Sequence, residues 1–204
     1  MRLYLASTSP ARLKTLRAAG VEPIVVPSQV DEDAALLQAG PLSPADTVLL
    51  LARLKAEAVA AANTELSGFI LGCDSVFELD GVIYGKPHEP EVARSRWALQ
   101  RGRTGTLHTG HWVIDNRGAA ATSNGRVSSA LVEFAHPTDD EIEAYIATGE
   151  PLEVAGAFTI DSLGGPFVKS VEGDPHTVVG LSLAALRELL LGFGVQWHEL
   201  WERN

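Results

Sequence analysis

The sequence predicts an α/β or α+β fold in which helices pack on a β-sheet. Segments with helical patterning alternate with short apolar, strand-like segments along the whole chain. The chain has 204 residues, of which 46% are apolar and 21% charged, enough for one substantial core. It contains no repeat, linker or low-complexity tract. We therefore expect a single domain over residues 1–204, with two small lobes as the alternative.

The amino-terminal third predicts two strand-like segments and two helices. Ser9 is a typical N-cap, Pro10 suits a first helical position and Gly20 is a typical helix stop. The second helix contains neither Gly nor Pro beyond its first turn, so it is expected to run for about five turns. In order, the predicted elements are a buried strand over 2–6, a helix over 10–19, an extended segment over 21–27, an acidic loop over 29–33 and a helix from 43 to 62.

The remainder predicts further strands and helices in alternation. Asp80 and Gly81 lie between apolar arms, as in a hairpin, and Thr138 with Glu141 forms a capping box. The predicted elements are a buried strand over 69–73 ending at Asp74, the hairpin, a helix over 91–99, long strands over 106–115 and 126–134, a helix from 138 to about 149, a strand over 166–171, a loop over 172–177 and a helix over 182–191.

Composition excludes several classes of function. The net charge of −10 argues against broad binding to nucleic-acid polymers, because phosphate contacts need a continuous basic surface. No apolar run approaches the roughly 20 residues that span a bilayer, and the first residues lack the apolar stretch of a secretory signal. We expect a cytoplasmic protein without membrane contact. The single cysteine, Cys73, lies in an apolar run and is expected to be buried and reduced.

Lys55 is the most unusual residue of the predicted 43–62 helix. At about 100° per residue, it falls in the middle of the apolar stripe formed by Val48, Leu51, Ala52 and Val59. Lysine is rarely placed there without a partner, because burial disfavours its charge. A functional ammonium group with a partner is one interpretation of this position. The alternative is a lysine whose chain passes along the core to reach water.

Asp74 and Lys86 form a second candidate pair. Asp74 follows the apolar run 69–73, where the change to a polar residue suggests an exposed carboxylate at a sheet edge or cleft. A turn centred on Asp80 and Gly81 places residue 75 opposite Lys86, so we expect Asp74 and Lys86 to be near neighbours. The alternative is an ordinary surface ion pair on a hairpin.

Two further segments suggest binding of anions and cations. Ser7 and Ser9 precede a helix whose first turn contains Arg12, and hydroxyls, free backbone donors and a guanidinium together suit a phosphate group. Simple N-capping would explain the same residues. The acidic residues 31–33 offer hard oxygen ligands for Mg²⁺ or Mn²⁺, or form a solvated turn.

Other motifs offer less. His108 and His111 are three residues apart on a predicted strand, so they point to opposite faces and should not chelate one metal; we interpret them as structural or surface residues. The sequence lacks a GxxxxGK[ST] phosphate loop, a GxGxxG after the first strand, and GxSxG. The common ATPase, dinucleotide-binding and hydrolase signatures are thus absent.

Together these segments resemble the Maf family of nucleotide pyrophosphatases. LASTSPAR resembles the family's SxSPRR-like turn, VDED its acidic pair, LARLKAEA its helix lysine, and GCDSV its G-[AS]-D block. GKP, GEPLEVAGAFTIDSLGG and EGDPHTVVGLSL follow in the family's order. The resemblance covers nearly the whole chain. It implies an elongated α/β fold similar to inosine triphosphate pyrophosphatases, with two lobes around a cleft, and often a homodimer.

The resemblance assigns roles to the same residues. It implies hydrolysis of nucleoside triphosphates to monophosphate and pyrophosphate, with Arg12, Lys55 and Lys86 compensating phosphate charge. On this hypothesis Glu32 and Asp74 hold Mg²⁺ or Mn²⁺, and Asp74 or the metal activates the attacking water. The alternative of another class is a nucleotide-binding regulator of cell division without turnover.

Departures from the family pattern leave the preferred base open. Ala11 stands where a bulky or basic residue is usual, and Ser182 replaces a proline. Ser75 and Asp161 occupy positions that differ between the family's dTTP/UTP and 7-methyl-GTP subgroups, and neither subgroup is matched cleanly. We include both as substrate-binding candidates. The carboxylate of Asp161 could accept hydrogen bonds from the N1 and N2 donors of a guanine.

Overall fold

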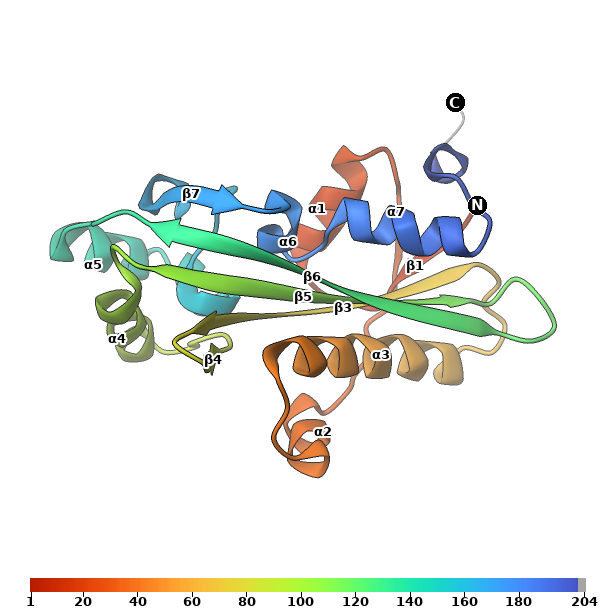
Figure 1. The fold of residues 1–204 in the computed structure, drawn as a ribbon. Helices are drawn as coiled ribbons and strands as arrows, with labels where there is room; N and C mark the ends of the chain where they lie inside the picture. Colours follow the sequence, from red (N-terminus) through yellow and green to blue (C-terminus); the bar gives the residue numbers. More distant parts are fainter. Residues whose placement is uncertain (202–204) are drawn as a thin grey trace. The chain divides into compact units, whose positions relative to one another are not determined.

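A computed structural model describes residues 1–201 and contains a mixed sheet (Figure 1). Within the described residues the sheet has seven strands in the order β2-β1-β3-β5-β6-β7, with β4 paired to β3. β1 pairs in parallel with β2 and β3, whereas β4 and β7 pair antiparallel with β3 and β6. The strands are β1 (Leu3–Leu5), β2 (Ile24–Val25), β3 (Phe69–Leu79), β4 (Val82–Tyr84), β5 (Thr104–Asp115), β6 (Thr122–Phe134) and β7 (Val168–Glu172).

Seven α-helices and four short 3₁₀ helices accompany the strands in the described part of the chain. The α-helices are α1 (Pro10–Ala18), α2 (Glu32–Ala39), α3 (Pro44–Ala62), α4 (Pro90–Gln100), α5 (Asp139–Ala147), α6 (Pro175–Val179) and α7 (Leu183–Gly192). The 3₁₀ helices are η1 (Glu150–Glu153), η2 (Ala155–Ala157), η3 (Gly165–Phe167) and η4 (Trp197–Leu200). None of the helices within residues 1–201 is long and apolar enough to cross a membrane. The predicted α/β class is confirmed.

The chain divides into two compact units. Unit one comprises residues 1–74, 109–128 and the described residues from 180 onward; unit two comprises 75–108 and 129–179. β3, β5 and β6 each contribute residues to both units. The prediction of a single domain stays a prediction.

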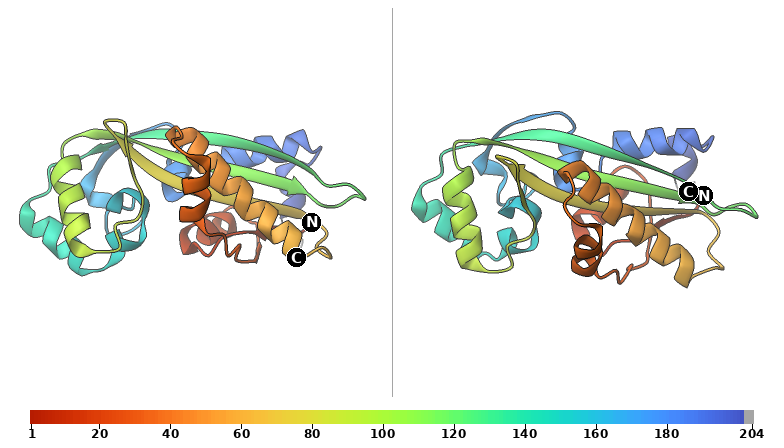
Figure 2. Two further views of the ribbon diagram at one scale, coloured as in Figure 1. Left: turned by 90° about the horizontal axis from the view of Figure 1, so that it is seen from below. Right: turned by 60° about the horizontal axis from the view of Figure 1, so that its bottom comes forward.

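Unit one is layered around β1 and the first half of β3. Because successive side chains of a strand point to opposite faces, Leu3 and Leu71 pack with α1 and α7, whereas Tyr4 and Ile70 pack with α3. Figure 1 shows α3 on one face of these strands and α1 with α7 on the other. Figure 2 shows α2 beside α3.

Unit two has an aromatic core. The ring of Trp97 on α4 meets the rings of Phe134 and Tyr145 edge-on, at centroid distances of 5.6 and 5.9 Å. The indole N–H of Trp97 donates to the Ala157 carbonyl at 2.9 Å, so its polar atom is satisfied inside the core. Phe158 completes the cluster against Phe134.

The helix starts predicted at Ser9, Ser43 and Thr138 are confirmed, because each depends on a local cap. The hydroxyl of Ser9 accepts from the Arg12 amide, and that of Ser43 from the Asp46 amide. The capping box of Thr138 and Glu141 is present at the start of α5. The hairpin turn is also confirmed, with φ of 54° at Asp80 and 78° at Gly81.

Three predictions about elements are wrong. The apolar strand does not end at Asp74 but continues to Leu79, because the carboxylate is paired rather than exposed. The predicted acidic loop over 29–33 contains the start of α2, where Asp31 is the N-cap and its carboxylate accepts from the Ala34 amide at 2.9 Å. The predicted loop over 172–177 runs into α6.

Candidate active site

Lys55, Asp74 and Glu32 form a charge cluster in unit one. The Nζ atom of Lys55 lies 2.6 Å from Asp74 Oδ1 and 2.9 Å from Glu32 Oε1. The side chains of Lys55 and Asp74 are 10% and 11% exposed, whereas that of Glu32 is 46% exposed. The prediction that Lys55 lies in the apolar stripe is confirmed, and the alternative in which its ammonium simply reaches water is wrong.

A close helix–strand contact creates this cluster. Gly72 of β3 lies so near α3 that an added Cβ would come within 2.0 Å of the Ala52 carbonyl oxygen. Residues 72 and 74 point to the same face of β3, and residue 55 lies about one turn after 52 on α3. The glycine therefore brings α3 close enough for Lys55 to reach Asp74. Cys73 points to the opposite face and is buried there in the unit-one core.

Arg12 and Ser7 form a second polar group in unit one. Arg12 Nη1 donates to Ser7 Oγ at 3.1 Å, and Arg12 Nε donates to the Gly180 carbonyl at 2.7 Å. The Ser9 amide also donates to Ser7 Oγ, at 3.2 Å. Ser7 is buried, and Arg12 is half-buried. Local patterning pointed to Ser7, Ser9 and Arg12, but gave no signal for Gly180, which lies 168 residues further on.

Burial and neighbouring charges act in opposite directions on Asp74. Burial raises the pKa of the carboxyl group, and the positive charges of Lys55 and Arg12 oppose that rise without cancelling it. A raised pKa gives the carboxylate more affinity for a proton, which suits a general base. Burial also raises the pKa of the Cys73 thiol to about 11, so this cysteine is an inert core residue, as predicted.

Lys86, Ser75 and Asp161 lie in unit two. The antiparallel β3–β4 register pairs Phe77 with Tyr84. Two residues further out, the same register would place residue 75 opposite Lys86, as the hairpin prediction assumed. The paired part of β4 ends at Tyr84, and Lys86 is exposed just beyond it. The expected proximity of Asp74 and Lys86 therefore stays a prediction.

Asp161 lies on an exposed segment of unit two that Glu150 holds. Glu150 Oε1 accepts from the Tyr145 hydroxyl at 3.0 Å, the Thr159 hydroxyl at 2.6 Å and the Gly164 amide at 3.2 Å. The resemblance to the Maf family pointed to Asp161, and nothing in the sequence singled out Glu150, whose hydrogen-bond partners in and after α5 come together only in the folded unit. Glu150 thus fixes both ends of the segment that carries Asp161.

The family assignment follows from a comparison with protein families. The model of the Maf-like protein family matches residues 2–193. The chain belongs to this family. A nucleoside triphosphate pyrophosphatase of Leifsonia xyli subsp. xyli is 63% identical to this Maf-like chain over 210 residues, covering 100% of the chain and 98% of the relative.

A second relative carries the same name as the first, and one solved structure is also similar to the chain. A nucleoside triphosphate pyrophosphatase of Nocardia farcinica is 52% identical over 203 residues, covering 98% of the Maf-like chain and 96% of the relative. Among solved structures, the Staphylococcus aureus Ham1 protein matches with a TM-score of 0.40 and 15% identity, over 66% of this chain and 72% of that one.

The carboxylates of this Maf-like protein suit a divalent cation only in part. No group of three or more His, Cys, Asp or Glu side chains within residues 1–201 could hold a metal by itself. Glu32 and Asp74 nevertheless meet at one point, the Lys55 ammonium. Two carboxylates fit Mg²⁺, which commonly takes one or two protein carboxylates and completes its shell with water and substrate phosphates.

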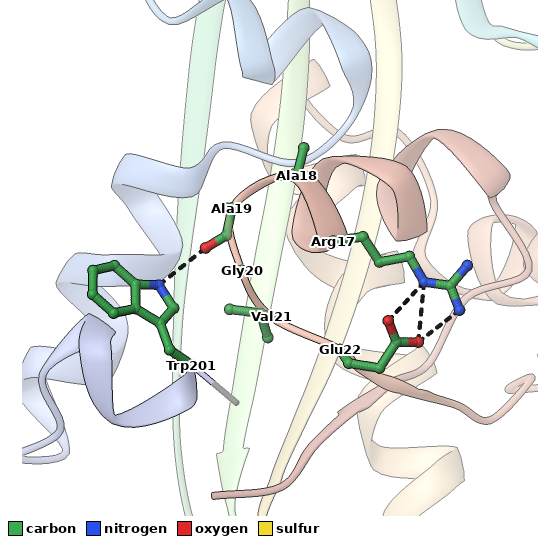
Figure 3. Close-up of a pocket in the computed structure, with 7 residues that line it drawn as sticks. All are labelled: Arg17, Ala18, Ala19, Gly20, Val21, Glu22 and Trp201. Carbon is green, nitrogen blue, oxygen red and sulfur yellow. Dashed lines mark hydrogen bonds and ion pairs between the residues drawn. The ribbon is translucent and has the colours of Figure 1, made fainter. Parts of the chain in front are cut away.

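An open hollow of about 670 Å³ lies elsewhere in unit one of the Maf-like chain (Figure 3). It is formed at the carboxyl end of α1 by residues 17–22 and Trp201, whose indole N–H donates to the Ala19 carbonyl at 3.1 Å. Arg17 and Glu22, which flank it, are paired with each other. Because none of the predicted site residues lines it, this hollow is not the candidate active site.

Proposed function

We propose that this protein hydrolyses nucleoside triphosphates to nucleoside monophosphate and pyrophosphate, at a site built around Lys55 and Asp74. The observation that carries the proposal is the buried ion pair of these two residues in a Maf-like chain. A buried ammonium group between two carboxylates can exchange a carboxylate partner for a phosphate. The curated relatives named above as nucleoside triphosphate pyrophosphatases support the same activity.

In the proposed reaction Asp74 acts as the general base. Its carboxylate takes a proton from a water molecule whose oxygen attacks the α-phosphorus. The bond from the α-phosphorus to the bridging oxygen breaks, and pyrophosphate leaves with the bonding electron pair. The raised pKa of Asp74 supports this role, since the carboxylate must hold the proton that it removes.

Positive side chains would balance the charge of the triphosphate. Lys55 and Arg12 provide two cations in unit one, and Lys86 is the proposed third. Ser7 and Ser9 add hydroxyls beside the amino end of α1, where backbone amides favour an anion. In a protein with a net charge of −10, these cations, together with a divalent ion held by Glu32 and Asp74, would compensate the charge of the triphosphate.

Glu32 and Asp74 are the proposed ligands of Mg²⁺ or Mn²⁺. Such an ion, when bound with the substrate, would neutralise phosphate charge and polarise the reacting phosphoryl group. Ser75 and Asp161 are the proposed contacts to the nucleoside, and the Asp161 carboxylate suits a base with adjacent N–H donors such as guanine. A cytoplasmic location and a homodimer complete the proposal.

The deciding experiment measures pyrophosphate release, with Mg²⁺ or Mn²⁺, from dTTP, UTP, CTP, GTP, 7-methyl-GTP and pseudo-UTP. We expect release of equal amounts of monophosphate and pyrophosphate from at least one of them. Nucleotide binding without release from any would instead favour the regulator of cell division that does not turn substrate over.

Substitution Asp74→Asn tests the role of the base. Loss of a general base typically lowers turnover by about 10²- to 10⁴-fold, so kcat should fall by that factor while circular dichroism shows an intact fold. Asp46→Asn at the start of α3 is the matched control, because Asp46 is exposed. Turnover by Asp74→Asn at the unchanged rate would remove Asp74 from the mechanism.

A further inference from the structure

His111 on β5 is a fully buried imidazole whose two nitrogens both face backbone groups. Its Nε2 lies 2.8 Å from the Ser182 amide nitrogen, and its Nδ1 lies 3.3 Å from the Arg126 carbonyl oxygen. An amide N–H can only donate and a carbonyl can only accept. The ring is therefore neutral, with its proton on Nδ1 and its Nε2 accepting from Ser182.

The backbone that His111 holds also orients Arg12. Gly180, two residues before Ser182, accepts the Arg12 Nε–H at 2.7 Å through its carbonyl oxygen. Gly180 has a φ of 107°, which a residue with a side chain rarely adopts. The backbone conformation that directs this carbonyl toward Arg12 therefore requires a glycine. Leu181 and Ser182 are buried, which leaves the short span between the two hydrogen bonds little freedom to move.

The Arg12 guanidinium is planar, so one fixed nitrogen restricts the direction of the others. The bond from Nε to Gly180 sets the plane in which Nη1 reaches Ser7 Oγ. Without the hydrogen bond to Gly180, the Arg12 side chain could sample several rotamers. Each substrate-binding event would then have to order this side chain, at a cost in conformational entropy.

We propose that His111 is a positioning residue for Arg12, acting through residues 180–182. This inference rests on the proposed role of Arg12 in binding the triphosphate. The linkage joins three elements of unit one: β5 supplies His111, the start of α7 supplies the backbone, and α1 supplies the guanidinium. A histidine suits the position because its ring offers an acceptor and a donor on opposite sides, whereas an apolar side chain would leave the buried Ser182 amide unpaired.

The first test needs no activity. In ¹⁵N NMR spectra of the full chain, the Arg12 Nε–H should exchange with solvent about tenfold faster in His111→Leu than in the natural protein. His111→Gln should restore slow exchange, because its amide oxygen can accept from Ser182. Ile114→Ala is the control, since Ile114 lies on the same strand but packs on the opposite face, in the α3 layer. Unchanged Arg12 exchange in His111→Leu would overturn the proposal.

The second test is a double-mutant cycle on pyrophosphate release. We expect His111→Leu to lower kcat/KM by about 10- to 100-fold, as misplaced binding groups do. Added to Arg12→Ala, His111→Leu should cost almost nothing further. Losses that simply add would show that His111 acts on folding in general and would overturn the proposal. An inactive natural protein would refute the proposed function instead, and the exchange test would still decide the role of His111.

Discussion

Lys55 holds a positive charge where only a tenth of its side chain reaches solvent. Buried ion pairs seldom stabilise a fold more than apolar side chains of the same size would, because both charges must leave water. The pair of Lys55 and Asp74 therefore has no clear value for the fold alone. Its value is explained if a phosphate group of the substrate replaces a carboxylate as the partner of the ammonium group.

Two substitutions separate this functional value from stability. Lys55→Met alone leaves the buried Asp74 without its closest cation, so the free energy of unfolding should fall by about 3 kcal/mol at neutral pH. Lys55→Met combined with Asp74→Leu removes both charges and should recover most of that loss. Urea unfolding measures both values, and neither variant should release pyrophosphate. A double variant that keeps its turnover would contradict the proposed site.

Single residues were predictable where the pattern around them is local. The apolar stripe of one helix is enough to single out Lys55, and the hydroxyls around a Ser-Pro helix start point to Ser7 and Arg12. The residues that these side chains contact could not be predicted in the same way. Asp74 lies 19 residues from Lys55 and Gly180 lies 168 from Arg12, so only the packing of separate elements brings them together. No periodicity in one segment contains that information.

Elements show the same division between local and distant causes. Helix starts follow from a side chain that caps an amide three residues away, which is why Ser9, Ser43 and Thr138 were sufficient signals. α2 was missed because it buries no residue and so lacks an apolar stripe. β3 was predicted too short because a charged residue such as Asp74 normally marks the end of a buried strand. Here the strand continues, because Lys55 of the neighbouring helix α3 pairs with that carboxylate.

The segment around Glu150 gives a prediction for pH dependence. Burial opposes ionisation of Glu150, but hydrogen bonds from Ser162, Thr159 and Tyr145 outweigh it and lower the pKa of the carboxyl group below its ordinary value of 4.5. The unfolded chain therefore binds more protons than the native protein in the window just below that value. This contribution to stability is present above about pH 4.5 and is lost as the pH falls through the lower, native pKa.

Substitution Glu150→Gln should remove that contribution. The difference in unfolding free energy between the natural protein and Glu150→Gln should be largest near neutral pH and shrink toward pH 3, as measured by urea unfolding at several pH values. Glu153→Gln, a change at an exposed position three residues further on, is the control. A difference that does not vary with pH would show that the ionised carboxylate is not what holds the segment.

At the scale of the whole molecule, the strands connect the two units. β3 passes from unit one to unit two between Asp74 and Ser75, and β5 and β6 also contribute to both units. A candidate base and a candidate nucleoside contact are therefore neighbours in one strand. Composition and interleaved patterning were enough to predict a mixed α/β protein. They left two lobes as an alternative to a single domain but could not predict which segments form each unit, since each unit is assembled from segments far apart in the sequence.

Three strands shared by both units should make unfolding cooperative, because neither unit can lose its strands without breaking hydrogen-bonded ladders that continue into the other. Trp97, buried in unit two, can report on that unit when the other tryptophans are replaced by Phe. Trp97→Phe leaves the remaining tryptophans, all in unit one, as the complementary probe. In each variant, tryptophan fluorescence and far-ultraviolet circular dichroism should give the same urea midpoint. Separate midpoints in either variant would mean that the units unfold independently, and the predicted single domain would then be two.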